Sequence, residues 1–200
     1  MAKRGNIGLA ALSDSAGLDE APTAYHAGYV LGPRVNAGGR VGESSLGIRL
    51  LSTSDVGAAK AIALRLGEFN KERQSIEADV LDAATAQIEA RGEMRVPIII
   101  AAGADWHAGV VGIVASRLKE RFSRPAIVIA VAEGVGKASC RSIAGVDIGA
   151  AITAARQAGL LLNGGGHAMA AGFTVGEEQL EALGNFLIER LAPYVTAARQ

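Results

Sequence analysis

The 200-residue sequence predicts an α/β protein with a mixed sheet in its C-terminal half. Between Ala59 and Ile88, apolar residues recur at intervals of three and four, which is typical of one long amphipathic helix. Past Gly92, short apolar runs of strand length alternate with amphipathic segments of helix length. Before the long helix, the chain has few apolar residues of its own to pack, as expected for the helical tail of another domain.

The N-terminal segment is predicted to contain three short helices. The first spans residues 5–16, the second spans residues 23–31 with Thr23 as its N-cap, and the third spans residues 44–51. The pair Gly32-Pro33 is expected to end the second helix, which makes residues 34–40 a loop.

The long helix is expected to begin at Ser54 or Asp55, either of which can cap it. At 1.5 Å per residue it is roughly 50 Å long, which favours a bridge between two lobes. Gly57 and Gly67 leave open a bend that would fold the helix onto a single core.

The C-terminal half is predicted to alternate strands and helices. The predicted strands span residues 96–102, 126–132, 136–143 and 168–175, and the predicted helices span residues 109–122, 147–157 and 177–192. Asp147 is the expected N-cap of the second of these helices. We therefore expect three parts: the end of one domain over residues 1–53, a connecting helix over 54–92, and an α/β domain over 93–200.

Three consecutive glycines, Gly164, Gly165 and Gly166, predict a loop, because glycine weakens the interior of a helix or a strand. Without Cβ atoms, their N–H groups can converge on one point and form a backbone nest for an anion such as phosphate. His167 then lies at the rim of the nest, where it can donate a hydrogen bond. A glycine hairpin with a surface histidine is the alternative that the triplet alone leaves open.

Two further polar groups are candidates for binding. Arg34, Asn36 and Arg40 form a compact set in the predicted loop, where they can reach a terminal phosphate or instead attach the loop to another domain. His107 precedes a glycine-rich helix start, and it can cap that helix or line a cleft. Its neighbour Trp106 is expected to be a core residue rather than a base-stacking platform.

Three segments resemble one family. Gly-Gly-Gly-His-Ala-Met-Ala-Ala-Gly at 164–172 resembles the signature of the DHHA1 domain, the substrate-binding half of the DHH phosphoesterases. Gly-Pro-Arg-Val-Asn-Ala-Gly-Gly-Arg at 32–40 resembles the branch of that family that degrades single-stranded DNA, as do Asp-Trp-His at 105–107 and the run at 109–118. The resemblance covers nearly all of the chain.

The resemblance implies that residues 139–142 contact phosphate. An arginine on a strand would not by itself indicate this role. In the family, a Ser-Gly-Arg-Ser-like segment faces the phosphate of the nucleic acid, and here it reads Ser-Cys-Arg-Ser, with Cys140 in place of glycine. Arg141 would offer a planar fork of donors and Ser142 a hydroxyl. Without the resemblance, a solvated or ion-paired Arg141 is the simpler interpretation.

The resemblance also implies an activity: removal of nucleotides from the 5′ end of single-stranded DNA with Mn²⁺ or Mg²⁺. In the family, the metal ligands lie in an N-terminal domain upstream of every segment present here. The three histidines, His26, His107 and His167, are far apart in the sequence, and no Asp-His-His or Asp-x-Asp occurs. We therefore expect no catalytic residue and no metal ligand in this chain; Asp105, His107 and His167 together would be a weak site at best.

The composition limits which binding partners and which cellular compartment are expected. Twenty basic and twenty acidic residues balance, so any nucleic-acid site must be local. A lone cysteine cannot form an internal disulfide, which suits a reducing compartment, and no apolar run is long enough to span a bilayer, so a cytoplasmic location and no membrane partner are expected. Two alternatives stay open: a phosphodiesterase for short oligoribonucleotides or cyclic dinucleotides, and a non-catalytic nucleic-acid-binding module.

Overall fold

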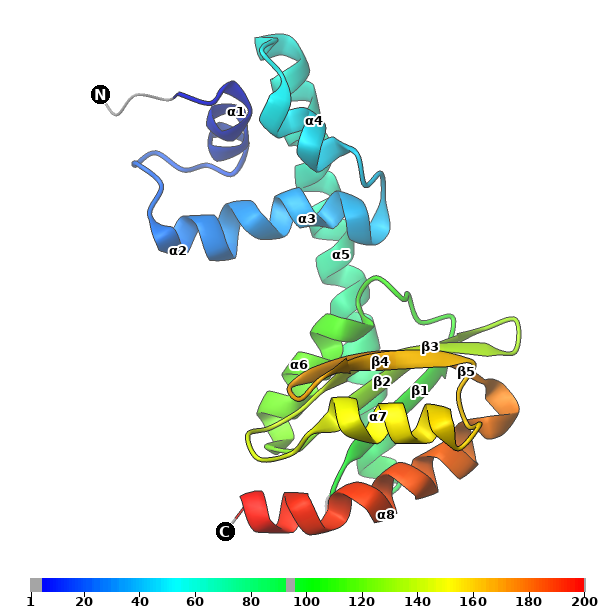
Figure 1. Ribbon diagram of the computed structural model, residues 1–200. Helices are drawn as coiled ribbons and strands as arrows, with labels where there is room; N and C mark the ends of the chain where they lie inside the picture. Colours follow the sequence, from blue (N-terminus) through cyan, green and yellow to red (C-terminus); the bar gives the residue numbers. More distant parts are fainter. Residues whose placement is uncertain (1–4, 93–95, 200) are drawn as a thin grey trace. The chain divides into compact units, whose positions relative to one another are not determined.

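The computed structural model of the protein describes residues 5–92 and 96–199 (Figure 1). Its contacts divide the chain into a helical unit, Met1–Ile76, and a sheet unit, Glu77–Gln200. The long helix α5 (Val56–Ala90) begins in the first unit and ends in the second. As predicted, Asp55 caps it: its Oδ1 accepts hydrogen bonds from the N–H groups of Gly57 (2.7 Å) and Ala58 (3.1 Å).

The described residues of the helical unit form helices joined by loops, without a strand: α1 (Ile7–Ser15), α2 (Ala24–His26), the π-helical turn η1 (Ala27–Leu31), α3 (Gly32–Val41), α4 (Leu46–Ser52) and the start of α5. Its core is small. The largest buried side chains, from four different elements, are Leu12, Leu31, Leu46, Leu50, Ile62, Leu66 and Phe69.

The prediction that Gly32-Pro33 ends a helix is wrong, because η1 continues directly into α3. Proline fits in the first turn of a helix, where its missing N–H is not needed. Gly32 fits the junction for a steric reason: a Cβ on it would lie 2.7 Å from the carbonyl oxygen of Ala27. Residues 34–40 are therefore helical rather than a loop.

The sheet unit is built on five strands in the order β1-β2-β3-β5-β4 (Figure 1). The pair β1–β2 is parallel and is connected through α6, while the pairs β2–β3, β3–β5 and β5–β4 are antiparallel. The elements are β1 (Ile99–Ala104), α6 (Val111–Phe122), β2 (Ala126–Ala132), β3 (Val135–Arg141), α7 (Ile148–Gln157), β4 (Asn163–His167), β5 (Ala170–Gly176), the 3₁₀ turn η3 (Glu177–Gln179) and α8 (Leu180–Ala198). The predicted mixed α/β fold is confirmed.

Helices pack on both faces of the sheet. Ile127, Cys140 and Phe173, from three neighbouring strands, belong to the buried cluster that includes the apolar side chains of α7 and α8. Because side chains alternate between faces along a strand, the residues between them point to the other face. There, α6 packs against β2 and β3.

The free edge of β1 is covered by a side chain of α5. The amide of Gln87 donates from Nε2 to the carbonyl oxygen of Ala102 (3.0 Å) and accepts at Oε1 from the N–H of the same residue (3.0 Å). An ion pair between Arg117 of α6 and the buried Glu77 of α5 adds a second attachment. The C-terminal part of α5 is thereby fixed to the sheet unit.

The prediction of a loop over the glycine triplet is also wrong, because these residues form the edge strand β4. Successive N–H groups of a strand point in opposite directions, so they cannot converge into the predicted nest. Close pairing explains the glycines: a Cβ on Gly166 would lie 2.5 Å from the carbonyl oxygen of Ala170 and 2.6 Å from Cβ of Ala171. A two-residue turn then leads into β5.

No helix in the described part of the chain is long and apolar enough to cross a membrane.

Candidate nucleic-acid interface

Strands β3, β5 and β4 bring the two best binding motifs of the sequence onto one face. Arg141 pairs with Ala170, which pairs with His167, so the three residues form one row across the sheet. We call this surface the Arg141 face; from strand to strand, its rows are Arg141–Ala170–His167, Ser139–Gly172–Gly165 and Lys137–Thr174–Asn163.

The middle of the Arg141 face lies lower than its two sides because its central residues have small side chains or none. At about 4.8 Å between neighbouring strands, the backbones at Arg141 and His167 lie roughly 10 Å apart, with only the methyl group of Ala170 between them. A Cβ on Gly165 would meet no atom within 4 Å. His167 is exposed and Arg141 is half-buried, so a ligand can reach both.

Arg141 lies beside the first turn of α6. Its Nη1 donates to Ser139 Oγ (3.0 Å) and to the carbonyl oxygen of Cys140 (2.8 Å), which fixes the guanidinium against the sheet. A Cβ on Gly112 would lie 3.1 Å from Nη2 of Arg141, so the absence of a side chain there admits the guanidinium.

This position favours an anion. The N-terminus of a helix carries partial positive charge and unpaired N–H groups, and a guanidinium adds a full charge with a fork of donors. Among the described residues, acceptors lie at hydrogen-bond distance only from Nη1 of Arg141, so its other nitrogens can donate to a ligand. Phosphate chemistry fits this combination of groups.

Ser142, predicted to offer a hydroxyl to phosphate, has a different role. It is 1% exposed, and its Oγ donates to the carbonyl oxygen of Val146 (2.6 Å) while its N–H donates to that of Met169 (2.9 Å). These bonds fix the turn before α7, so the hydroxyl is not available to a ligand.

The serine beside the guanidinium is Ser139, which the sequence interpretation missed. Strand alternation would have revealed it, because residues 139 and 141 share a face and residue 142 does not. The same alternation places Cys140 on the opposite face, where burial raises the pKa of its thiol to about 12. Cysteine in place of the family's glycine therefore leaves the Arg141 face unobstructed.

His107 and Trp106 belong to the turn before α6. The Nδ1 atom of His107 accepts a hydrogen bond from the N–H of Gly109 (3.0 Å), and the ring is exposed. The helix itself starts after Val110 without a side-chain cap, so His107 closes the turn rather than capping α6. Trp106 is half-buried and its ring covers Gly103.

In the helical unit, the expected compact set of Arg34, Asn36 and Arg40 does not form. At 3.6 residues per turn, Asn36 is rotated about 160° from Arg34 around the α3 axis, which places the two side chains on opposite sides. Arg34 donates from Nη1 to the carbonyl oxygen of Val30 (2.7 Å), one turn back in its own helical segment.

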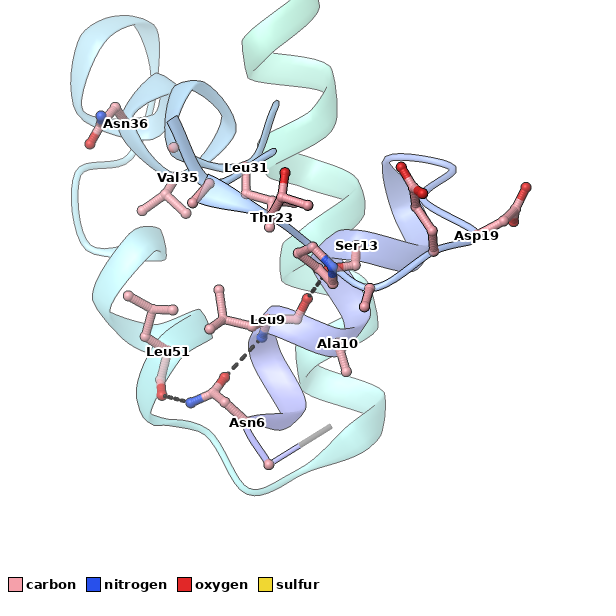
Figure 2. Close-up of a pocket in the computed structure, with 16 residues that line it drawn as sticks. Asn6, Leu9, Ala10, Ser13, Asp19, Thr23, Leu31, Val35, Asn36 and Leu51 are labelled. Atoms are coloured by element: carbon pink, nitrogen blue, oxygen red, sulfur yellow. Dashed lines mark hydrogen bonds between the residues drawn. The ribbon is translucent and has the colours of Figure 1, made fainter. Parts of the chain in front are cut away.

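Asn36 lines a groove of about 1090 Å³ within the helical unit (Figure 2). The wall is mainly apolar, with Leu9, Val35 and Leu51 among its residues, and Asn6 ties it together by donating to the carbonyl oxygen of Leu51 (2.9 Å). Asp19 is the acidic residue labelled in Figure 2, and the described lining contains no lysine or arginine. The charge of this groove disfavours a phosphate.

The described residues contain no group of three or more His, Cys, Asp or Glu side chains that could hold a metal ion. Asp105, His107 and His167 are not brought together as a ligand set. A divalent metal of the kind that the resemblance implies does not fit the described residues of this chain.

Comparison with known proteins agrees with this geometry. Residues 95–192 match the DHHA1 domain. The single-stranded-DNA-specific exonuclease RecJ of Bacillus subtilis is 39% identical over 164 residues, covering 81% of this chain and 20% of that protein, and RecJ of Dickeya dadantii is 41% identical over 182 residues, covering 87% and 31%. The crystal structure of RecJ in complex with Mn²⁺ from Thermus thermophilus superposes with a TM-score of 0.83 at 31% identity, covering 95% of this chain and 28% of that one.

The sheet unit, with its glycine strand and Arg141 row, is thus a DHHA1 domain. The chain belongs to the RecJ family. It spans 20% to 31% of the length of the relatives described above.

Proposed function

We propose that this chain is the substrate-binding portion of a single-stranded-DNA exonuclease that removes nucleotides from the 5′ end. The Arg141 face would hold the sugar-phosphate backbone, with Arg141 as the main phosphate ligand and His167 opposite it. Backbone contacts carry no base information, so sequence preference should be slight. The observation that carries this proposal is the strand register that puts Arg141 and His167 in one row with only Ala170 between them.

The hydrolytic chemistry would come from residues outside this chain. Phosphodiester hydrolysis by Mn²⁺ or Mg²⁺ needs clustered carboxylates and histidines, and the described residues hold no such cluster. In the proposed arrangement, residues 1–53 end the metal-binding catalytic domain, residues 54–92 connect, and residues 93–200 bind substrate. Arg34, Arg40 and His107 are proposed as secondary contacts, whereas Asn36, which lines a groove whose charge disfavours phosphate, is not.

The proposal is tested by the salt dependence of binding. Arg141→Ala should weaken binding of a 5′-phosphorylated deoxythymidine oligonucleotide and lower the slope of log K against log salt by about 0.7, the value for one phosphate on a single strand. Arg190→Ala is the matched control, because Arg190 is exposed on α8 beside Phe186. His167→Ala should cost about 1–3 kcal/mol of binding free energy, as for a hydrogen bond to a charged group.

Fluorescence anisotropy at several salt concentrations gives both quantities, and thermal unfolding checks that the variants fold. If Arg141→Ala has the same slope as wild type, Arg141 does not contact phosphate and the proposed interface is wrong. If His167→Ala lowers thermal stability strongly and binds normally, His167 is a structural residue.

A further inference from the structure

We infer that Lys137 binds a second phosphate of the same single strand, so that the Arg141 face takes several nucleotides rather than one phosphate. This inference rests on the proposed function, because it extends the Arg141 site along β3. Lys137 and Arg141 lie on the same face of that strand, separated by Ser139. Lys137 is exposed, so its ammonium group can reach a ligand that lies along the strand.

The spacing of the two cations exceeds one nucleotide. Four residues along a strand cover about 13 Å at roughly 3.3 Å per residue. A stacked strand advances about 3.4 Å per nucleotide, so Lys137 and Arg141 would address phosphates up to about four nucleotides apart, and fewer if the strand is extended. A dinucleotide bound at Arg141 would therefore leave Lys137 without a phosphate.

The surface between the cations can accept a backbone. Its floor is formed by Gly172 and Gly165, with open space above Gly165, whereas Ser139 in the same row lies against Gly112 of α6. Beside Lys137, the next strands present Thr174 and then Asn163, neutral side chains that can form hydrogen bonds with phosphate or sugar oxygens.

The charge of the face matches a polyanion. Strands β3, β4 and β5, all of whose residues are described, contain no Asp or Glu, and their charged side chains are Lys137, Arg141 and, when protonated, His167. The closest acids in the sequence, Glu133 and Glu177, lie beyond the ends of β3 and β5, at the end of the sheet where Lys137 lies. On strands β3, β5 and β4 themselves, a single strand laid beside α6 and over Gly172 and Gly165 would thus meet cations and neutral groups.

The experiment compares two ligands, a 5′-phosphorylated deoxythymidine dinucleotide and the corresponding dodecamer, with the variants Lys137→Ala, Lys137→Gln and Arg141→Ala. Lys119→Ala is the control, since it removes the same charge from α6, where Lys119 lies 3.7 Å from Glu120. Lys137→Ala should weaken dodecamer binding about three- to tenfold at low salt and lower the salt slope by about 0.7. It should leave dinucleotide binding unchanged, whereas Arg141→Ala should weaken both ligands.

The outcomes separate the two ideas. If Arg141→Ala weakens both ligands while both Lys137 variants bind the dodecamer like Lys119→Ala, the extended site is wrong and the Arg141 site stands. If Lys137→Ala weakens the dinucleotide as much as the dodecamer, Lys137 belongs to the first phosphate site and the inference is overturned. If Arg141→Ala changes neither ligand, the proposed function fails and the extended site fails with it.

Discussion

Two glycine-containing motifs of this chain, residues 34–40 and 164–166, were both predicted as loops, and neither is one. The first lies in helix α3 and the second in strand β4. In each motif, one glycine lies where a side chain would collide with a neighbouring backbone, and its neighbour does not. A Cβ on Gly38 would lie 2.7 Å from the carbonyl oxygen of Glu43, whereas one on Gly39 would come no closer than 4.0 Å to Ser44.

The motifs differ in what the unobstructed glycine faces. In β4, Gly166 is obstructed by Ala170 and Ala171, while Gly165 opens onto the Arg141 face. In α3, Gly39 is exposed, and the atom closest to a Cβ on it would be Cβ of Ser44, at 4.0 Å. In both motifs, therefore, one glycine allows two backbone segments to approach closely. In β4, a second glycine, Gly165, also leaves open space above the Arg141 face for a ligand.

The largest effect should come from Gly166→Ala. The new methyl group would collide with the backbone of β5, and overpacking of this kind costs about 3 kcal/mol of unfolding free energy when the backbone must move. Gly165→Ala is the matched control and should be neutral or gain up to about 1 kcal/mol, because alanine loses less backbone entropy on folding. Urea unfolding of both variants measures the difference, and equal stabilities would show that close pairing does not explain the glycines of β4.

A smaller effect is expected for Gly38→Ala in α3. Overpacking against Glu43 and Leu66 costs about 1–3 kcal/mol, and the higher helix propensity of alanine returns about 1 kcal/mol, which leaves a net loss of up to about 2 kcal/mol. Gly39→Ala should instead stabilise the protein by up to about 1 kcal/mol. Thermal unfolding of the pair tests this, and a stabilised Gly38→Ala would show that α3 adjusts to the extra methyl group.

Sequence patterns that depend on neighbouring residues predicted the structure correctly, whereas patterns that depend on distant contacts did not. The predicted strand at 126–132 matches β2, and Asp55 and Asp147 cap the helices assigned to them, because alternation and capping are local. The two glycine segments were misassigned because the reason for each glycine is an atom distant in the sequence or in a neighbouring strand. Leu66 Cδ2, which would lie 3.2 Å from a Cβ on Gly38, belongs to another helix.

The candidate site was predictable in its residues but not in its arrangement. Arg141 and His167 were selected separately, and only the insertion of β5 between β3 and β4 makes them neighbours in one row. Strand order is a property of the whole sheet, and no spacing in the sequence encodes it. Ser139 and Lys137 could have been found by alternation from Arg141, whereas the role of Gly112 beside the guanidinium could not.

At position 140, in contrast, a cysteine replaces a glycine of the family and does not obstruct the Arg141 face, because its side chain is buried on the opposite face. Burial raises the pKa of the Cys140 thiol to about 12 from an ordinary 9.0, so the folded protein keeps the proton when the unfolded chain loses it. The protein should therefore lose stability above about pH 9, by up to about 1.4 kcal/mol per pH unit, and show no effect of this thiol below that pH.

The measurement is urea unfolding between about pH 8 and pH 10 for wild type and Cys140→Ala. The variant lacks the thiol, so the stability difference between the two proteins should shrink as the pH rises through this window. A constant difference would mean that the thiol ionises equally in both states and is not shielded by the core.

Neither glycine motif provides metal ligands, so we expect the purified chain not to hydrolyse DNA. Hydrolysis needs a metal-bound water aimed at phosphorus, which takes several carboxylate or imidazole ligands converging within a few ångström. The glycine strand supplies a floor and Arg141 supplies a cation beside the N-terminus of α6, a combination that attracts phosphate and repels Mn²⁺. The purified chain should bind a 5′-labelled oligonucleotide weakly and in a salt-sensitive way, and release no mononucleotide in millimolar Mn²⁺. Release that a chelator abolishes would contradict this division of roles, and it would bring Asp105, His107 and His167 forward as metal ligands.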